Sequence, residues 1–209
     1  MNPTRRLAVQ ALPAEAPLQM SAALDQLAEH AQAGVTVVCG FPASGKSTAA
    51  RYLADIANAV IIDKDAFAPD LEESVMAELT GDPFDRDSAT YMRVVNPHIY
   101  SAFIHQAFIV ASHVPVIVDA PFIGHVQAAM GRGLSLSDHI CSRVSITPPP
   151  IRTVWISAHP NQIRERMSER AAARDTGKLA DWQTYRANIL DSGIEDSARA
   201  VVDYVVRNH

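Results

Sequence analysis

Short, mainly apolar runs alternate along the chain with segments in which apolar residues recur every three or four positions. Five of the short runs predict strands, at residues 35–39, 60–62, 114–119, 153–157 and 200–206. They are rich in valine and isoleucine and lack an alternating polar face. This is typical of strands of a parallel sheet that is buried on both sides.

The segments between these runs have the periodicity of amphipathic helices. It predicts helices over residues 18–30, 47–58, 71–79, 96–112, 136–145 and 161–174, and a further helical face over 179–189. Strands that alternate with helices predict an α/β fold, a parallel sheet with helices on both faces. We expect an N-terminal arm and helix over 1–33 and one domain over 34–209, with residues of about 161–190 as a helical lid.

The composition narrows the choice of partners. The 209 residues fit one α/β domain, and the formal net charge of −5 comes without any long lysine or arginine run. A nucleic-acid partner is therefore unlikely. Polar residues and prolines interrupt the first 17 residues, and no apolar run approaches the length of a bilayer span, so we expect neither a signal peptide nor a membrane partner. The cysteines, Cys39 and Cys141, match no metal-ligand spacing and fit a reducing cytoplasm.

One loop carries a specific motif. Residues 40–47 match G-x-x-x-x-G-K-[ST] between a predicted strand and a predicted helix, which is the context that a phosphate-binding P-loop requires. Its backbone N–H groups and the helix N-terminus attract phosphate oxygens. The expected nucleotide-binding residues are Gly40, Phe41, Pro42, Ala43, Ser44, Gly45, Lys46, Ser47 and Thr48.

The motif also predicts individual roles. Lys46 is expected to reach the β- and γ-phosphates of ATP, and the Ser47 hydroxyl to ligate Mg²⁺. We expect the Lys46 side chain to face solvent when no nucleotide is bound. The loop does not choose between GTPases, ATPases and kinases, which all share it.

Three aspartates follow predicted strands and so should meet at one edge of the sheet. Asp65 is the candidate that orients and deprotonates an acceptor hydroxyl, with Asp63 next in line. The alternative is that Asp65 only caps the following helix. Asp119 is the candidate Mg²⁺ ligand beside Ser47, and the alternative is an aspartate in a turn.

Arg166, Arg170 and Arg174 lie four residues apart on one predicted helix. Three like charges on one face predict a partner that carries several negative charges, such as the phosphates of a nucleotide. The alternative is a solvated helix whose charges form salt bridges.

Residues 40–48 and the segment 61–67, Ile-Ile-Asp-Lys-Asp-Ala-Phe, resemble the small P-loop kinases related to polynucleotide kinase, zeta toxins and chloramphenicol phosphotransferase. The resemblance covers about residues 34–175. It implies a kinase-type P-loop fold with a helical lid, unlike the ring-forming ATPases. It further implies that Asp65 serves the acceptor hydroxyl and that Arg166 and Arg170 act in catalysis, together with Lys46 of the loop. Arg174, on the same helical face, is the further candidate for a nucleotide contact.

One position departs from that family pattern. Ala68 stands where polynucleotide kinases and zeta toxins carry a basic residue, which weakens the case for a phosphorylated acceptor. The acidic side chains nearby are Asp70, Glu72, Glu73, Asp82, Asp85 and Asp87. They indicate either solvated loop charge or a pocket for a neutral or cationic molecule.

The sequence thus predicts an ATP- and Mg²⁺-dependent kinase that phosphorylates a hydroxyl of a small molecule. The alternatives are a kinase for a polynucleotide 5′-hydroxyl or a nucleotide sugar, and an ATP-binding regulatory module with little turnover. The acceptor and the oligomeric state stay open. Trp182 and Tyr185 are interpreted as packing residues, His98 and His105 as histidines without a metal, and Cys39 as an inert buried thiol.

Overall fold

A five-stranded, wholly parallel sheet forms the centre of the protein. The computed structural model describes residues 18–172 and 175–208. The strands are β1 (Val35–Cys39), β2 (Val60–Asp63), β3 (Val116–Asp119), β4 (Ile151–Ser157) and β5 (Tyr204–Arg207), in the order β2-β3-β1-β4-β5. β1 lies in the middle of this order, so the loop that follows it opens at the centre of the sheet edge.

The register of the strands brings polar residues together at their carboxyl ends. Asp63 of β2 lies opposite Asp119 of β3, and Asp119 also lies opposite Val38 of β1. The two aspartates therefore sit at the sheet edge where the loop after β1 begins. Ligands of open α/β sheets bind at this edge.

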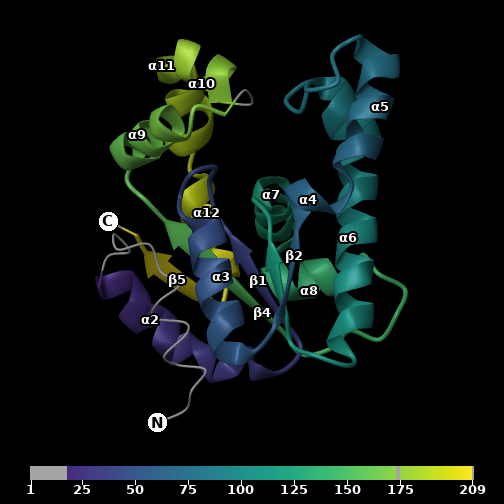
Figure 1. Cartoon of the computed structure of the whole chain (residues 1–209), viewed down its shortest axis with the longest axis vertical. Helices are drawn as coiled ribbons and strands as arrows, with labels where there is room; N and C mark the ends of the chain where they lie inside the picture. The colour runs from purple at the N-terminus through teal and green to yellow at the C-terminus, as the bar shows by residue number, and fades with distance from the viewer. Residues whose placement is uncertain (1–17, 173–174, 209) are drawn as a thin grey trace.

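Helices cover both faces of the sheet, as Figure 1 shows. The core on one face is built with α2 (Leu18–Ala28), the short 3₁₀ helix His30–Gln32 and α3 (Lys46–Ala57). The core on the other face is built with α6 (Asn96–Ala111), α7 (Ile123–Arg132), α8 (Leu136–Cys141) and α12 (Ile194–Val201). The continuous apolar runs of the central strands follow from this two-sided burial.

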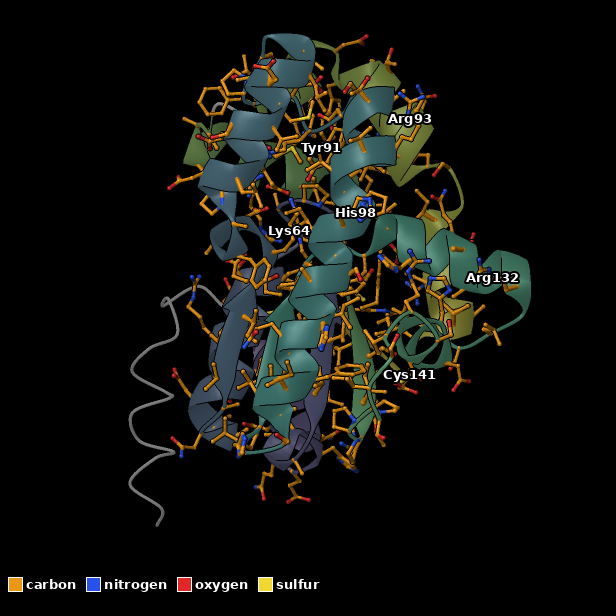
Figure 2. The ribbon with its side chains drawn as sticks, turned by 90° about the vertical axis from the view of Figure 1, so that its right-hand side faces the viewer. Lys64, Tyr91, Arg93, His98, Arg132 and Cys141 are labelled. Atoms are coloured by element: carbon orange, nitrogen blue, oxygen red, sulfur yellow. The ribbon has the colours of Figure 1, made fainter. Side chains whose placement is uncertain are left out.

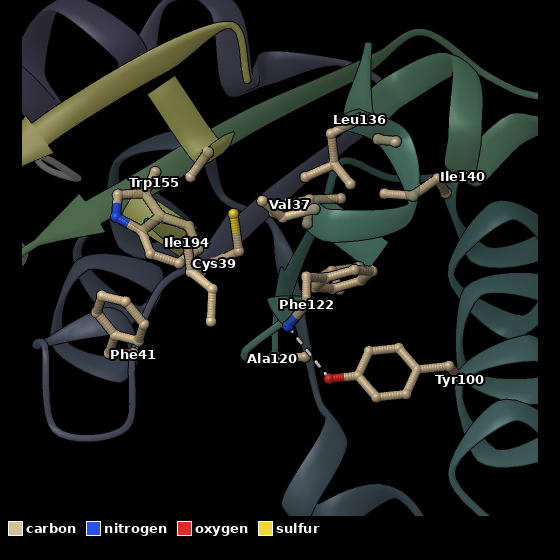
Figure 3. Packing of buried hydrophobic residues seen from close by; sticks show 14 of the residues in the cluster. Val37, Cys39, Phe41, Tyr100, Ala120, Phe122, Leu136, Ile140, Trp155 and Ile194 are labelled. Atoms are coloured by element: carbon tan, nitrogen blue, oxygen red, sulfur yellow. Dashed lines mark hydrogen bonds between the residues drawn. The ribbon is translucent and has the colours of Figure 1, made fainter. Parts of the chain in front are cut away.

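Aromatic side chains from the loop after β1 and the loop after β3 belong to the second of these cores (Figure 3). The rings of Phe41 and Trp155 meet edge to face with centroids 5.2 Å apart, and those of Tyr100 and Phe122 do so at 5.1 Å. Edge-to-face pairs of this kind hold a preferred geometry. They anchor the loop after β1 and the loop after β3 to the same core.

Two groups of helices rise beyond the carboxyl ends of the strands (Figure 1). One contains α4 (Lys64–Phe67), α5 (Pro69–Thr80) and the π helix Tyr91–Val95. The other, which we call the 160–190 segment, contains α9 (Pro160–Arg170), α10 (Thr176–Ala180), α11 (Trp182–Tyr185) and the π helix Arg186–Leu190.

The structure confirms the parallel α/β fold and contains every predicted strand. The first or last residue of several strands differs from the prediction. Residue 114 is not in β3, because its N–H bonds to the carbonyl of Val110 at the end of α6. Residues 200 and 201 are not in a strand, because the N–H of Val202 bonds to Ala198 and closes α12.

The helix predictions needed larger corrections. The helix expected over 161–174 ends at Arg170, and the helical face over 179–189 is divided among α10, α11 and a π helix. The helix expected over 136–145 ends at Cys141. The sequence interpretation missed α7 and α12. Within residues 18–172 and 175–208, no helix is both long and apolar enough to span a bilayer.

Candidate functional site

The loop between β1 and α3 depends on two glycines with left-handed backbone conformations. Gly40 has φ of 145°, and an added Cβ there would lie 2.6 Å from the carbonyl oxygen of Ile156. Gly45 has φ of 99°, and its added Cβ would lie 2.2 Å from Nδ2 of Asn208. Both the conformation and the close approach exclude larger residues. The Gly-x-x-x-x-Gly spacing is therefore required by the shape of the loop.

Lys46 lies inside this loop. Its side chain is only 8% exposed, and Nζ donates a hydrogen bond of 2.9 Å to the carbonyl oxygen of Phe41. The expectation that Lys46 faces solvent is therefore wrong. Burial lowers the pKa of Lys46, while the negative charges of Asp119 and Asp65 oppose this. A partly desolvated cation that lines the cleft suits an incoming phosphate oxygen.

Asn208 supports the loop from behind, which the sequence interpretation did not anticipate. Its Nδ2 donates a hydrogen bond of 2.8 Å to the carbonyl oxygen of Ser44, and its backbone N–H donates one of 2.8 Å to Ser157. Its Oδ1 accepts from Nη2 of Arg166 at 3.4 Å. Asn208 therefore joins the loop, β4 and α9.

Asp119 lies beside the loop as predicted. It is 5% exposed at the end of β3, and burial raises its pKa, against the opposing effects of the Lys46 charge and a hydrogen bond from the Ser47 side chain. Ser47 and Asp119 are thus in direct contact. The described residues contain no group of three or more histidine, cysteine, aspartate or glutamate side chains fit to hold a metal. A hydroxyl and one carboxylate instead suit Mg²⁺, which completes its coordination with water and phosphate oxygens.

Asp65 is exposed in the first turn of α4. The carboxylate that caps this helix belongs to Asp63, whose Oδ1 accepts the backbone N–H of Asp65 at 2.8 Å. The charge of Asp65 also affects the pKa of Lys46 and that of Tyr100, so the carboxylate is close to both side chains. The capping role proposed as the alternative for Asp65 therefore falls to Asp63.

The two described arginines of the stripe line the same cleft as Lys46. Nη1 of Arg166 donates to the carbonyl oxygen of Ser44 at 3.4 Å, and burial lowers the pKa of Arg166. Nη2 of Arg170 donates to Oδ1 of Asp175 at 2.8 Å, and Nε bonds to the other carboxylate oxygen. Asp175 is 1% exposed. Both guanidinium groups are therefore oriented by the chain. Arg174 lies outside the described residues.

These residues share one cleft of about 1,470 Å³ between the two groups of helices. Lys46, Asp119, Arg166 and Arg170 line it from the loop and the 160–190 segment. An ion pair of 3.1 Å between Lys178 of α10 and Asp87 of the loop after α5 connects the two groups of helices. The structure thus brings together every predicted catalytic and metal-binding residue that it describes, while the roles themselves stay predictions.

The opposite wall of the cleft holds a buried ionic network that the sequence did not reveal. Glu72 is 2% exposed and lies 2.8 Å from Nζ of Lys64 and 2.9 Å from Nη1 of Arg86. The Tyr91 hydroxyl donates to Glu72 at 2.8 Å and accepts from Lys64 at 2.8 Å. Figure 2 shows Lys64 and Tyr91 together on this side of the molecule. The interpretation of Glu72 as solvated loop charge, or as acidic lining, is therefore wrong.

The residues set aside from the sequence behave largely as expected. Cys39 is fully buried, its Sγ donates to the carbonyl of Val154, and burial raises its pKa. Trp182 is buried against the guanidinium of Arg164, whose Cζ lies 5.8 Å from the ring centroid. His98 and His105 are exposed on α6. Tyr185 is half-buried but lines the cleft, and its hydroxyl has no partner in the described part of the chain.

The strand order and the phosphate loop define an α/β P-loop NTPase fold. The model of the AAA domain family matches residues 35–190, and the chain belongs to this family. The fold is that of a small P-loop kinase, as the sequence resemblance predicted.

Among solved structures, a shikimate kinase shares the fold. Shikimate kinase from Acinetobacter baumannii, in complex with shikimate, is 14% identical with a TM-score of 0.50 over 87% of this chain and 88% of that one. A Chloroflexus aurantiacus protein provisionally described as a kinase is 16% identical with a TM-score of 0.45 over 84% of each chain. No curated protein matches the sequence at a significant level.

Proposed function

We propose that the protein is a phosphotransferase that moves the γ-phosphoryl group of ATP to a hydroxyl of a small molecule. The observation that carries this proposal is the position of Asp65. An exposed carboxylate close enough to affect the pKa of Lys46 lines the same cleft as the phosphate loop. A carboxylate at this place can orient an acceptor hydroxyl toward the γ-phosphate and receive its proton.

The residues of the cleft fit ATP and Mg²⁺. The loop N–H groups and Lys46 would hold the phosphates, and Ser47 and Asp119 would hold Mg²⁺. Bound Mg²⁺ offsets the negative charge of the phosphate oxygens. In the transfer, the bond from the γ-phosphorus to the β-γ bridging oxygen breaks as the bond to the acceptor oxygen forms. Asp65 takes the acceptor proton, and Arg166 and Arg170 stabilise the equatorial oxygens.

A small acceptor fits the molecule better than a nucleic acid. The chain carries a net charge of −5, and Ala68 stands at the position of the basic clamp. The shikimate kinase of the same fold was solved with shikimate, a small hydroxylated molecule. We place the protein in the cytoplasm, a setting with which the free thiols of Cys39 and Cys141 agree.

ADP formation measured with a panel of alcohols and with a 5′-hydroxyl oligonucleotide tests the proposal, with Lys46→Ala as the inactive control. Stimulation of the wild type by a small alcohol supports it. Stimulation by the oligonucleotide alone would establish a polynucleotide kinase. Tight ATP binding without transfer to any acceptor would establish a regulatory module.

A further inference from the structure

The wall of the cleft opposite the phosphate loop indicates the class of acceptor, and this inference rests on the proposed function. Asp65, Asn96, Tyr100, His125 and Gln127 line this wall. The charge of Asp65 raises the pKa of Tyr100, and the rings of Tyr100 and His125 have centroids 4.8 Å apart. The candidate base, the phenol and the imidazole are therefore neighbours.

The cationic side chains of this wall already have a carboxylate partner within the chain. Lys64 and Arg86 share the buried carboxylate of Glu72, at 2.8 and 2.9 Å. Both cations also lie over the ring of Tyr91, with Nζ and Cζ at 5.5 and 5.6 Å from its centroid. An anionic acceptor would have to compete with a buried, hydrogen-bonded carboxylate for them, which is unfavourable.

The aspartates of the loop after α5 are likewise engaged. Oδ1 of Asp82 accepts the backbone N–H of Phe84, and Oδ1 of Asp85 accepts that of Ser88, each at 2.9 Å. Asp87 pairs with Lys178 across the cleft. These carboxylates maintain the loop and its contact with α10, so an ammonium group on the acceptor would have to compete with these contacts.

Tyr100 offers an uncharged donor at the place where the acceptor must lie. Its hydroxyl accepts the backbone N–H of Phe122 at 3.2 Å, as the dashed line in Figure 3 shows. A phenol that accepts one bond keeps its own hydrogen to donate. Burial raises the pKa of Tyr100, so this hydrogen stays in place at neutral pH.

His125 offers a second uncharged group. Its ring packs against Phe122 at 5.3 Å and against the buried His139 at 5.4 Å, and its Nδ1 has no partner in the described part of the chain. Burial, together with the positive charges of His139 and Arg143, lowers its pKa to about 3. The imidazole is therefore neutral, and because its Nδ1 is buried it can present at most its other nitrogen to a ligand.

Exposed apolar side chains also line the cleft. Phe84 is 62% exposed and Met92 is 49% exposed, and both line the cleft. Exposed apolar residues at a cleft are typical of contacts with the C–H faces of a ligand.

We propose that the acceptor is an uncharged polyhydroxylated molecule, of the sugar or cyclitol class, held by hydrogen bonds from Tyr100, His125, Asn96 and Gln127 with one hydroxyl at Asp65. Neutral hydroxyls both donate and accept, so they satisfy these groups without displacing the Glu72 network. A wall of few, convergent, uncharged polar groups gives specificity for such a ligand.

The test compares three sets of acceptors at equal concentration by ADP formation and by mass of the product. The neutral set is glucose, myo-inositol and glycerol; the acidic set is gluconate, glycerate and shikimate; the amino set is glucosamine and ethanolamine. A member of the neutral set should give the largest stimulation over hydrolysis by water. A larger stimulation by an acid or an amine overturns the acceptor class and leaves the kinase intact. No stimulation by any set overturns both proposals.

Variants of the wall provide the second arm, with the best neutral acceptor. His125→Ala should raise the KM for the acceptor by about tenfold, the value of one to two hydrogen bonds, with the KM for ATP unchanged. His125→Gln, which keeps donor and acceptor groups, should recover part of this loss, and Tyr100→Phe should show the same selective increase. His98→Ala, an exposed histidine on α6, is the matched control and should leave both KM values unchanged. Unchanged acceptor KM in folded His125→Ala and Tyr100→Phe would overturn the proposal.

Discussion

Asp63 caps α4 by accepting the backbone N–H of Asp65 at its Oδ1, 2.8 Å away. The two aspartates therefore have separate positions in the same turn. Asp63 is tied to the backbone beside Asp119, and Asp65 extends from the first turn of the helix into the cleft. The carboxylate of Asp65 is not needed for capping, so its replacement should leave the cap of α4 in place.

Asp65→Asn should leave a folded protein that binds ATP and Mg²⁺ but transfers poorly. Asparagine keeps the size and a hydrogen-bonding oxygen and cannot take a proton. Loss of a general base typically costs on the order of a hundredfold to ten-thousandfold in rate. Single-turnover transfer and ATP binding should be measured together, because only transfer should fall.

Asp63→Asn is the matched control. Asparagine caps helices about as well as aspartate, so the stability of α4 should be preserved. The rate of transfer should fall less than in Asp65→Asn. The opposite ranking, with Asp65→Asn fully active, would make Asp63 the base.

Lys46→Ala should abolish productive use of ATP while the fold persists. The lost hydrogen bond to Phe41 is a single contact within the loop, worth about 1 kcal/mol, whereas the lost cation served the transferring phosphates. Circular dichroism and thermal unfolding report the fold, and ADP formation reports the chemistry. A folded variant with normal transfer would remove Lys46 from the mechanism.

The strands and the phosphate loop could be predicted because their signals are local. β1 and β3 are continuous apolar runs, and the loop is fixed by the glycines at 40 and 45, whose conformations few other residues adopt. α7 carried a weaker signal, whereas α12 was overlooked although its buried residues Ile194, Ala198 and Val201 have helical spacing. α7 is short, contains two glycines and starts after Phe122, which has φ of 53°. Helices of this kind form through tertiary packing rather than through their own propensity.

The supporting residues of the site could not be predicted, because their contacts join distant parts of the chain. Asn208 and Ser44 are 164 residues apart in sequence. Lys64, Glu72 and Tyr91 read as ordinary surface or loop residues, and only the packing of α4 against α5 and the π helix buries their charges together. A sequence motif predicted the roles of the phosphate loop, whereas no motif corresponds to the contacts that position this loop.

Arg170→Ala should slow phosphoryl transfer more than it weakens ATP binding. A guanidinium on the transferring group contributes most when charge redistributes in the transition state. Asp175→Asn should give a smaller loss in turnover, because it leaves Arg170 charged but removes the carboxylate that orients it. Rapid-quench kinetics and nucleotide titration separate the two effects. Equal losses in turnover and affinity for Arg170→Ala would indicate a contact with the bound nucleotide instead.

Asn208→Ala should weaken the binding of ATP, because the loop loses the bond to Ser44 and Arg166 loses a partner. One buried hydrogen bond is worth about 1 kcal/mol, so the KM for ATP should rise by roughly fivefold. Asn161→Ala, an exposed asparagine at the start of α9, is the control and should behave as wild type. An unchanged KM for ATP in Asn208→Ala would show that the loop holds its shape without this residue.

His125 should make the fold sensitive to acid. Its pKa is about 3 in the folded protein and 6.5 in the ordinary, exposed state. Between these values the unfolded chain binds a proton that the folded chain does not, so stability falls as the pH drops from 6.5 toward 3. Uptake of one proton changes the free energy of unfolding by at most about 1.4 kcal/mol per pH unit. The change is smaller where water reaches the ring. Burial lowers the pKa of His139 as well, so His139 adds to the pH dependence of stability in the wild type.

His125→Gln cannot take up this proton. Urea unfolding at pH 7, 6, 5 and 4 should therefore give a shallower dependence in the variant than in wild type, with His98→Gln unchanged. Identical slopes for His125→Gln and wild type would mean that His125 is accessible to protons in the folded state, and its place as a neutral group in the cleft wall would then be lost.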